Sequence, residues 1–170
     1  MQAAGSVSQL VVPKDDLRLG TADESNAFTY LSVPRGWLRF QAGPKVRARE
    51  LPSSWTAGRW HPAKWLRPVY GRLAMGGTHA VYILLMINFA AVQRVFDGWR
   101  WGHKLYLLNL ATAYYQTSVI DDGSMAVYVH VDDFGVLGTS AQWVDALLEE
   151  LVAELRRPQF RVKWIESAKE

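Results

Sequence analysis

The chain has no cysteine, which excludes disulfides, thiolate metal sites and cysteine nucleophiles and fits an intracellular protein. Residues 1–9 lack the basic-then-apolar order of a secretory signal. The longest apolar run, residues 80–92, is interrupted by Asn88 and is too short to cross a bilayer. We therefore expect no membrane partner.

Internal repeats and low-complexity tracts are also missing. Of the 170 residues, 49% are hydrophobic, which excludes global disorder and allows one domain with a sizeable core. We expect a flexible N-terminal segment over residues 1–16 and a folded domain over residues 17–170.

Positive charge is concentrated in one segment, residues 34–72. It holds nine basic residues against the single acid Glu50, a net charge of +8, and four of the eight tryptophans. Basic residues interleaved with aromatic ones suit a phosphate backbone with stackable bases. The alternative is a solvated basic face with ordinary core tryptophans. This segment is read as an insertion in the domain.

Hydrophobic periodicity predicts an α+β domain with an antiparallel sheet and its helices packed on one face. The clearest helix begins at Ser140, ends before Pro158 and has an apolar stripe at i, i+3, i+4 and i+7 spacing. Helices are also expected over residues 24–30, 78–96 and 104–115. Strands are expected over 17–23, 66–73, 125–131, 134–137 and 160–165, with a hairpin from 37–41 and 45–50 and a loop over 52–65.

Two adjacent acids, Asp132 and Asp133, lie between strands that otherwise read as buried. Such a pair needs water, a counter-charge or a metal. A second pair, Asp121 and Asp122, is followed by Gly-Ser and is typical of a surface turn. The apolar flanks therefore single out Asp132 and Asp133 as functional candidates.

Asp23 closes an expected strand upstream. If this strand neighbours the hairpin, the carboxylates of Asp23, Asp132 and Asp133 converge on one sheet edge. Hard oxygen ligands of this kind suit Mg²⁺ or Mn²⁺. Two such ions would clamp the attacking and leaving oxygens of a phosphoryl transfer. Alone, Asp23 would be read as a helix N-cap.

Three segments occur in a fixed order along the chain. The first is Asp23-Glu24-Ser25-Asn26-Ala27-Phe28 followed by Val33-Pro34, the second is Leu73-Ala74-Met75-Gly76-Gly77-Thr78, and the third is Val131-Asp132-Asp133. Together they resemble the three palm motifs of reverse transcriptases, in the style of retrotransposon enzymes. The resemblance covers residues 17–165 and implies a polymerase palm with partial fingers.

The resemblance also implies roles for individual residues. Asp23 and Asp132 would be the principal ligands of Mg²⁺ or Mn²⁺, with Asp133 as a supporting acid and the Glu24 backbone carbonyl as a further ligand. Phe28 would gate the sugar against a 2′-hydroxyl, or else be a core aromatic. The remaining substrate-binding positions would be Met75, Gly76, Arg67 and Arg72, with the basic residues 35–49 on phosphates.

Several positions depart from the family pattern. Ala74 and Gly77 replace a usual proline and a frequent tryptophan, and His130 stands where tyrosine or phenylalanine is frequent. We read His130 as a satisfied strand histidine rather than a catalytic group. The chain is short, so thumb, ribonuclease H or integrase domains would be lost or lie on a longer chain, and the isolated enzyme would be incomplete.

The expected function is RNA-directed DNA polymerisation, with an RNA or DNA template-primer and a deoxynucleoside triphosphate as substrates. The alternative is a truncated or decayed retroelement fragment that folds, and binds nucleic acid, without polymerising. An RNA-templated RNA polymerase is a weaker third reading, because Phe28 would exclude the 2′-hydroxyl of its substrate.

Overall fold

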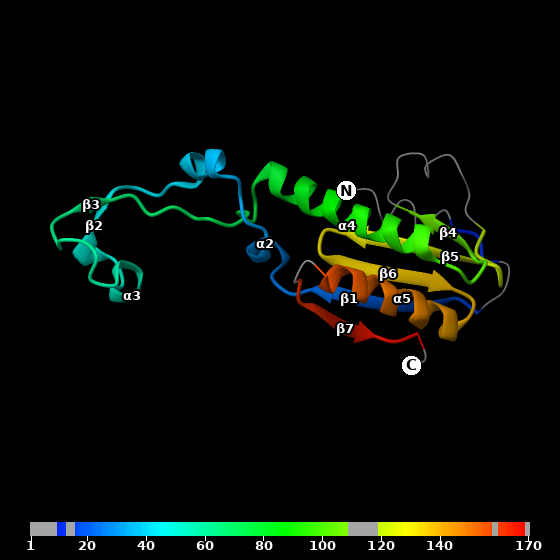
Figure 1. Cartoon of the computed structure of the whole chain (residues 1–170). Coiled ribbons are helices and arrows are strands. Elements are labelled where there is room, and N and C mark those ends of the chain that lie inside the picture. Colours follow the sequence, from blue (N-terminus) through cyan, green and yellow to red (C-terminus); the bar gives the residue numbers. More distant parts are fainter. Residues whose placement is uncertain (1–9, 13–15, 109–118, 158–159, 169–170) are drawn as a thin grey trace. The chain divides into compact units, whose positions relative to one another are not determined.

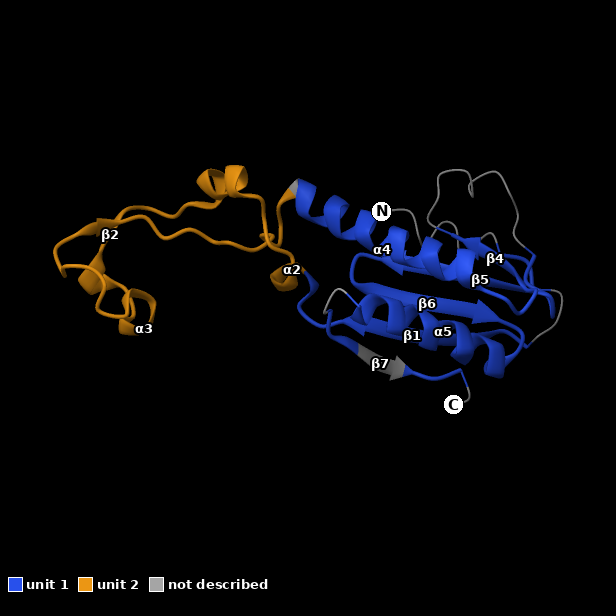
Figure 2. Cartoon of the chain, in the orientation of Figure 1, with its two compact units in different colours: residues 1–27, 78–170 blue, residues 28–77 orange. Residues whose placement is uncertain are grey.

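The computed structural model describes residues 10–12, 16–108, 119–157 and 160–168. The side chains of Thr78 and residues 163–165 are outside this description. The chain divides into two compact units, residues 1–27 with 78–170 (unit 1) and residues 28–77 (unit 2), which Figure 2 distinguishes by colour. Each unit is described separately below.

Unit 1 is built on a five-stranded sheet in the order β4-β5-β6-β1-β7. The strands are β1 (Arg18–Glu24), β4 (Lys104–Leu107), β5 (Ser124–His130), β6 (Asp133–Gly138) and β7 (Val162–Glu166). β1 lies between β6 and β7 and is antiparallel to both, and β5 is antiparallel to β6. The expected strands 17–23, 125–131, 134–137 and 160–165 are therefore confirmed within one or two residues.

Two long helices, α4 (Thr78–Gly98) and α5 (Ala141–Arg156), lie on one face of this sheet (Figure 1). Without the edge strand β4, the order is β1-α4-β5-β6-α5-β7, and the two β-α-β units interleave in the split arrangement. The α+β class with helices on one face is thus confirmed.

The expected antiparallel sheet is wrong at one edge, because β4 runs parallel to β5, with Lys104 opposite Ser124. The helix expected from Lys104 to Tyr115 is also wrong over its first four residues. Lys104-Leu105-Tyr106-Leu107 is too short to show a helical period, and its backbone groups are paired with β5 instead. Leu108, the next residue of that expected helix, is in a turn, and residues 109–115 lie outside the described residues.

Helix α5 follows the sequence pattern closely. Ser140 is its N-cap by backbone conformation and accepts from the Val144 amide at 3.0 Å, although its hydroxyl makes no capping hydrogen bond. The six residues of the predicted apolar stripe are all buried: Val144, Leu147, Leu148, Leu151, Val152 and Leu155. Fully burying each of these side chains stabilises the fold by about 1.5–3 kcal/mol.

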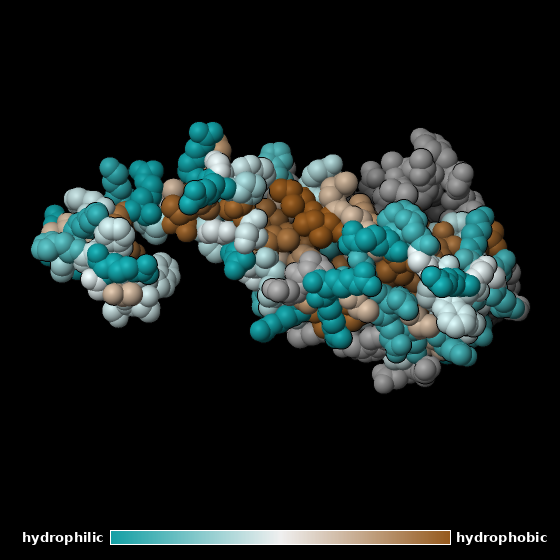
Figure 3. All heavy atoms as spheres, in the orientation of Figure 1, coloured by the Kyte–Doolittle hydropathy of each residue, from teal (hydrophilic) through white to brown (hydrophobic). Residues whose placement is uncertain are grey.

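Helix α4 is less buried than its apolar sequence suggests. One stripe faces the core (Ala80, Leu84, Asn88, Ala91, Val92 and Val95), whereas Tyr82 and Met86 are 62% and 48% exposed. Figure 3 shows hydrophobic atoms gathered over this helix. The sheet covers only one side of α4, which corrects the expectation of burial all round. By length and composition, His79–Gly98 is a helix that could also cross a membrane, a weak indication that core helices share.

The other face of the sheet carries a smaller apolar cluster. Leu108, Ile120, Ala126 and Leu137 are buried there, and Leu10 and Val12 pack against them. Val11 forms a parallel bridge with Val119, and the Ile120 amide donates to the Val11 carbonyl at 2.9 Å. This cluster covers the part of the sheet face around Leu137.

Unit 2 contains little regular structure and few buried side chains. Its elements are α2 (Ala27–Tyr30, which starts in unit 1), a 3₁₀ helix (Arg35–Gln41), β2 (Val46–Arg47), a second 3₁₀ turn (Ala48–Glu50), α3 (Ser53–Thr56) and β3 (Trp65–Leu66). β2 pairs with β3, and isolated bridges join Ala42 to Val69 and Ser32 to Arg72. These pairings place the two sides of unit 2 in one long antiparallel loop.

Four local expectations for unit 2 are therefore wrong. The strand expected over residues 66–73 is reduced to β3 and to isolated bridges at Val69 and Arg72. The hairpin expected from residues 37–41 and 45–50 does not form, since the first is a 3₁₀ helix and the second pairs with residues 65–66. The expected loop 52–65 contains the short helix α3. The two helical turns expected over residues 24–30 shrink to α2, because Glu24 is still part of β1.

Candidate acidic site at the β1 and β5–β6 edge

Three acids meet where β1 ends beside the β5–β6 turn. The register of β1 and β6 puts Asp23 directly opposite Asp133. The Glu24 amide donates to the Asp132 carbonyl at 2.9 Å, which joins the end of β1 to the turn. The condition set from the sequence, that β1 neighbours the hairpin, is therefore met, and Asp23 and Asp133 lie at the same end of the sheet.

The acids are divided between the two faces of the sheet. Along β1, Gly20, Ala22 and Glu24 are buried, and a Cβ on Gly20 would lie 3.1 Å from Leu148 of α5. Because strand residues alternate, Asp23 is on the face away from the helices. Asp133 is opposite Asp23 and shares that face. The carboxylates of Asp23 and Asp133 therefore face water and any ligand, and Glu24 faces the core.

The hairpin turn consists of Val131 and Asp132, with His130 paired to Asp133 across it. Val131 has φ +60°, a left-handed conformation that costs a β-branched residue about 1–3 kcal/mol. Asn88, buried in α4, donates to the Val131 carbonyl at 2.8 Å and to Glu24 Oε2 at 3.3 Å. The core helix thus holds a strained turn in place.

Burial and mutual repulsion perturb two of these carboxyl groups. The pKa of Asp133 is raised, first by desolvation and then by the charges of Asp132 and Asp23, while His130 opposes the rise. Burial, again with a contribution from Asp132 and Asp23, raises the pKa of Glu24 to about 7. Glu24 Oε1 and Asn88 Oδ1 are buried and have no hydrogen-bond partner within the described part of the chain, which a neutral Glu24 tolerates better than a charged one.

The second acidic pair has a different environment. Asp121 Oδ1 accepts from the Ser124 hydroxyl at 2.8 Å and from the Gly123 amide at 3.0 Å, and these hydrogen bonds lower the pKa of Asp121. Asp122 accepts from the Thr139 hydroxyl at 3.0 Å. These acids are explained by an exposed turn, as the sequence predicted. Among the described residues, none donates a hydrogen bond of this kind to the side chains of Asp23, Asp132 and Asp133.

The donor set suits a magnesium-type ion only in part. Within the described residues, no three His, Asp or Glu side chains form a ready-made metal group. Two carboxylates on one edge nevertheless match Mg²⁺, which takes one or two protein carboxylates and completes its shell with water and substrate phosphates. Asp23 and Asp133 would hold such an ion, with Asp132 beside them.

A shallow pocket lies beside Asp133 on the same face. Its volume is about 360 Å³, and Thr21, Tyr128 and His130 help to line it. The Tyr128 ring lies across Gly135, where an added Cβ would be only 2.0 Å from Tyr128 Cε1. His130 is the last residue of β5 and is exposed in this pocket. Its strand position is as expected, and the expectation that it is not catalytic stays a prediction. The turn leaves its side chain outside the core.

The expected substrate-binding residues Phe28, Met75 and Gly76 belong to unit 2. Phe28 is 5% exposed, which fits a core aromatic and leaves little ring surface for a sugar. Gly76 has φ +88°, and a Cβ there would meet nothing within 4 Å. Its glycine is required by the backbone conformation at the entry to α4 rather than by a close approach. Met75 is 75% exposed.

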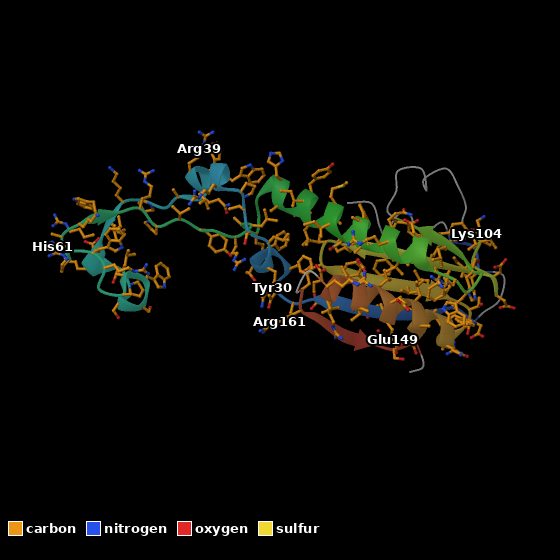
Figure 4. All side chains as sticks on the ribbon, viewed as in Figure 1. Tyr30, Arg39, His61, Lys104, Glu149 and Arg161 are labelled. Carbon is orange, nitrogen blue, oxygen red and sulfur yellow. The ribbon has the colours of Figure 1, made fainter. Side chains whose placement is uncertain are left out.

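The basic residues of unit 2 are mostly exposed and several lie against aromatic rings. Arg47 is over Trp65 at 5.0 Å, Lys64 over Trp60 at 4.0 Å, and Arg39 over Phe40 at 4.6 Å. Arg67 is exposed, whereas Arg72 donates to the Ser32 hydroxyl at 2.8 Å and the Tyr30 carbonyl at 3.3 Å. Figure 4 labels Arg39 and His61 among the side chains that project from this unit.

Sequence reasoning missed Asn88 and Tyr128 as parts of the site. The only sequence signal for Asn88 was a polar residue in the middle of an apolar helix, a position that requires a buried hydrogen-bond partner. Tyr128 has no such signal, because its contact with Gly135 depends on strand register.

Comparison of the sequence with known protein families and with curated proteins finds no match.

Proposed function

We propose that unit 1 is the palm of a reverse-transcriptase-like polymerase, which transfers a nucleotide from a deoxynucleoside triphosphate to a primer 3′-hydroxyl. The proposal is supported above all by the register that puts Asp23 opposite Asp133, with Asp132 in the adjoining turn. Carboxylates from two strands on one solvent-facing edge are the arrangement that this chemistry needs.

The residues of the chain would act by binding and orientation. Asp23 and Asp133 would hold Mg²⁺ or Mn²⁺ beside the triphosphate, with Asp132 and the Glu24 carbonyl next to them. The bound ions would neutralise phosphate charge and favour the 3′-hydroxyl as a nucleophile. Asn88 would keep the turn, and so Asp132, in position.

Unit 2 would contact the nucleic acid. It has a net charge of +8, and Phe40, Trp55 and Trp65 are 74%, 66% and 57% exposed. Exposed rings with neighbouring cations bind unpaired bases and phosphates together. Arg67 and the basic residues 35–49 are the expected phosphate contacts, whereas Arg72 is engaged within unit 2.

Primer extension by the full chain tests the proposal. The wild-type chain with Mg²⁺ or Mn²⁺ should extend a DNA primer on an RNA template, and EDTA should abolish extension. Asp133→Asn should reduce the rate by at least about 100-fold, and Asp122→Asn, a matched change in the other acidic pair, should not. Extension that survives Asp133→Asn would refute the metal assignment.

A second candidate is a folded fragment that binds nucleic acid without polymerising. Two observations favour it: the exposed basic and aromatic surface of unit 2, and the lack of a three-ligand metal group among the described residues. Salt-dependent binding of single-stranded RNA without any extension would support this candidate. Detectable extension would exclude it.

A further inference from the structure

Unit 1 also has a groove whose lining residues are separate from the acidic site. It lies where the segment after α4 faces α5, and it has a volume of about 300 Å³. Trp99 and Trp101 lie on one side, and α5 supplies the other side. The lining residues are Trp99, Trp101, Ala146, Glu149, Glu150 and Ala153.

The lining combines two indole rings with two carboxylates over two small side chains. None of the described residues that line this groove is basic. Glu149 and Glu150 are exposed, and Figure 4 shows Glu149 projecting from α5. Ala146 and Ala153 lie on the same face of α5, and their small side chains leave room between the indole rings and the carboxylates. The groove is therefore negatively charged and aromatic.

The exposed ring of Trp101 is supported from behind. Although Trp101 is 62% exposed, its ring centroid is 5.2 Å from that of Trp143, which is itself 4.8 Å from His103. Stacking of this kind fixes the orientation of an indole. Trp101 thus presents an aromatic ring of fixed orientation at the surface.

Nearby arginines are already paired with an acid. The adjoining cavity, which shares Trp99, Trp101 and Glu150, extends toward Arg94 and Arg157. Glu154, only 9% exposed, forms ion pairs with both of these arginines. The single charge of Glu154 offsets one of these two positive charges, and Arg100 also lines the adjoining cavity. The charged side chains that line the groove itself are Glu149 and Glu150.

We propose that this groove binds an arginine side chain of a basic polypeptide segment. A guanidinium stacks on an indole face through cation–π attraction and donates paired hydrogen bonds to a carboxylate. Lysine would bind less tightly, because its compact ammonium neither stacks nor forms the planar fork. Charge complementarity extends beyond the groove, since the chain outside residues 28–77 has ten basic and fifteen acidic residues, a net charge of −5.

Peptide titration of the full chain, followed by NMR of the indole N–H signals, tests the proposal. The probe is a glycine–serine peptide with one central arginine, compared with the same peptide carrying citrulline, lysine or glutamate. Spectra of Trp99→Phe and Trp101→Phe assign the two signals. The arginine peptide should shift both, with an affinity roughly tenfold higher than that of the uncharged citrulline peptide.

Variants separate the groove from non-specific attraction. Glu149→Gln with Glu150→Gln should weaken arginine-peptide binding roughly tenfold and leave the melting temperature nearly unchanged, because both acids are exposed. Trp55→Ala, an equally exposed tryptophan of unit 2, should leave binding intact. Equal affinity for arginine and citrulline peptides, or tighter binding of the glutamate peptide, would overturn the proposal. None of these outcomes depends on polymerase activity.

Discussion

The Asn88 side-chain amide donates a 2.8 Å hydrogen bond to the carbonyl of Val131. This bond links the middle of helix α4 to the two-residue turn that carries Asp132. The same amide contacts Glu24 at 3.3 Å. One buried side chain therefore connects the helix, the turn and the end of β1, and it accounts for a polar residue at the centre of an apolar helix.

Replacing Asn88 should be costly. Asn88→Ala leaves the Val131 carbonyl and the Glu24 carboxyl without their buried donor, and such losses destabilise by about 1–3 kcal/mol. Urea denaturation measures the change in the free energy of unfolding. Gln93→Ala, on the exposed side of the same helix, is the control and should cost less than about 0.5 kcal/mol. Equal losses of unfolding free energy in the two variants would contradict the role of Asn88 in holding the turn.

Glycine at position 131 should stabilise the chain. Val131 has φ +60°, and relief of this strain exceeds the entropy that glycine adds to the unfolded state, for a gain of roughly 0.5–1 kcal/mol. Val129→Gly, in the adjacent strand where φ is not positive, should lose stability instead. A lower urea midpoint for Val131→Gly than for wild type would show that the turn is not strained.

Stability should fall as pH rises, through Glu24. Its pKa in the fold is about 7, raised from 4.5, so between these values the native state holds a proton that the unfolded state has lost. The resulting loss in the free energy of unfolding is absent below about pH 4.5 and complete above about pH 7, where it is on the order of 3 kcal/mol. Urea midpoints across this range, in EDTA, measure it.

The matched variant is Glu24→Gln, which keeps an acceptor for Asn88 and cannot ionise. It should be more stable than wild type at pH 8 and should lose the slope between pH 4.5 and 7. An unchanged slope would assign the pH dependence to another group.

Tyr128 and Gly135 should be energetically coupled. Gly135→Ala places a Cβ 2.0 Å from Tyr128 Cε1, so the ring must move, at a cost of about 1–3 kcal/mol. In a Tyr128→Ala background the same substitution should cost far less. A double-mutant cycle of unfolding free energies measures the coupling, and additive effects would mean that the two residues do not meet.

Neutralising cations of unit 2 should lower the salt dependence of RNA binding. Arg47→Gln with Lys64→Gln removes two cations that lie over Trp65 and Trp60. The slope of log K against log salt should decrease by about 1.4 for a single strand. Fluorescence anisotropy with labelled RNA measures this slope, and Arg100→Gln in unit 1 serves as the control. Identical slopes would remove unit 2 from the interface.

Much of unit 1 could be predicted because its hydrophobic residues recur with a regular period and each element packs against few others. The stripe from Val144 to Leu155 fits only a helix with one buried face, and Asp132-Asp133 between apolar strands marks the hairpin. The strand Lys104–Leu107 could not be predicted, because four residues hold no period and its pairing with β5 is a tertiary choice.

The sequence-based predictions for unit 2 were wrong for a related reason. Gly43-Pro44 looked like the turn of a hairpin, yet Val46 pairs with Leu66, twenty residues away. Only Phe28, Ala48 and Leu73 are buried hydrophobic residues of this unit, so no core pattern fixes its register. Around the acids, the sequence predicted that Asp23 and Asp133 would lie close together if β1 neighboured the hairpin, and the structure supplies that pairing. The positions of Asn88 and His130 depend on contacts between elements, which the sequence does not show.

The most direct test of the acidic site uses Mn²⁺ as a paramagnetic probe in NMR of the full chain. Substoichiometric Mn²⁺ should broaden the backbone amide signals of Asp23, Glu24, Asp132 and Asp133 and leave those of Asp121 and Asp122 sharp, and Asp23→Asn should suppress the effect. Broadening centred on Asp121 and Asp122, or unaffected by Asp23→Asn, would contradict a metal site built jointly by β1 and the β5–β6 turn.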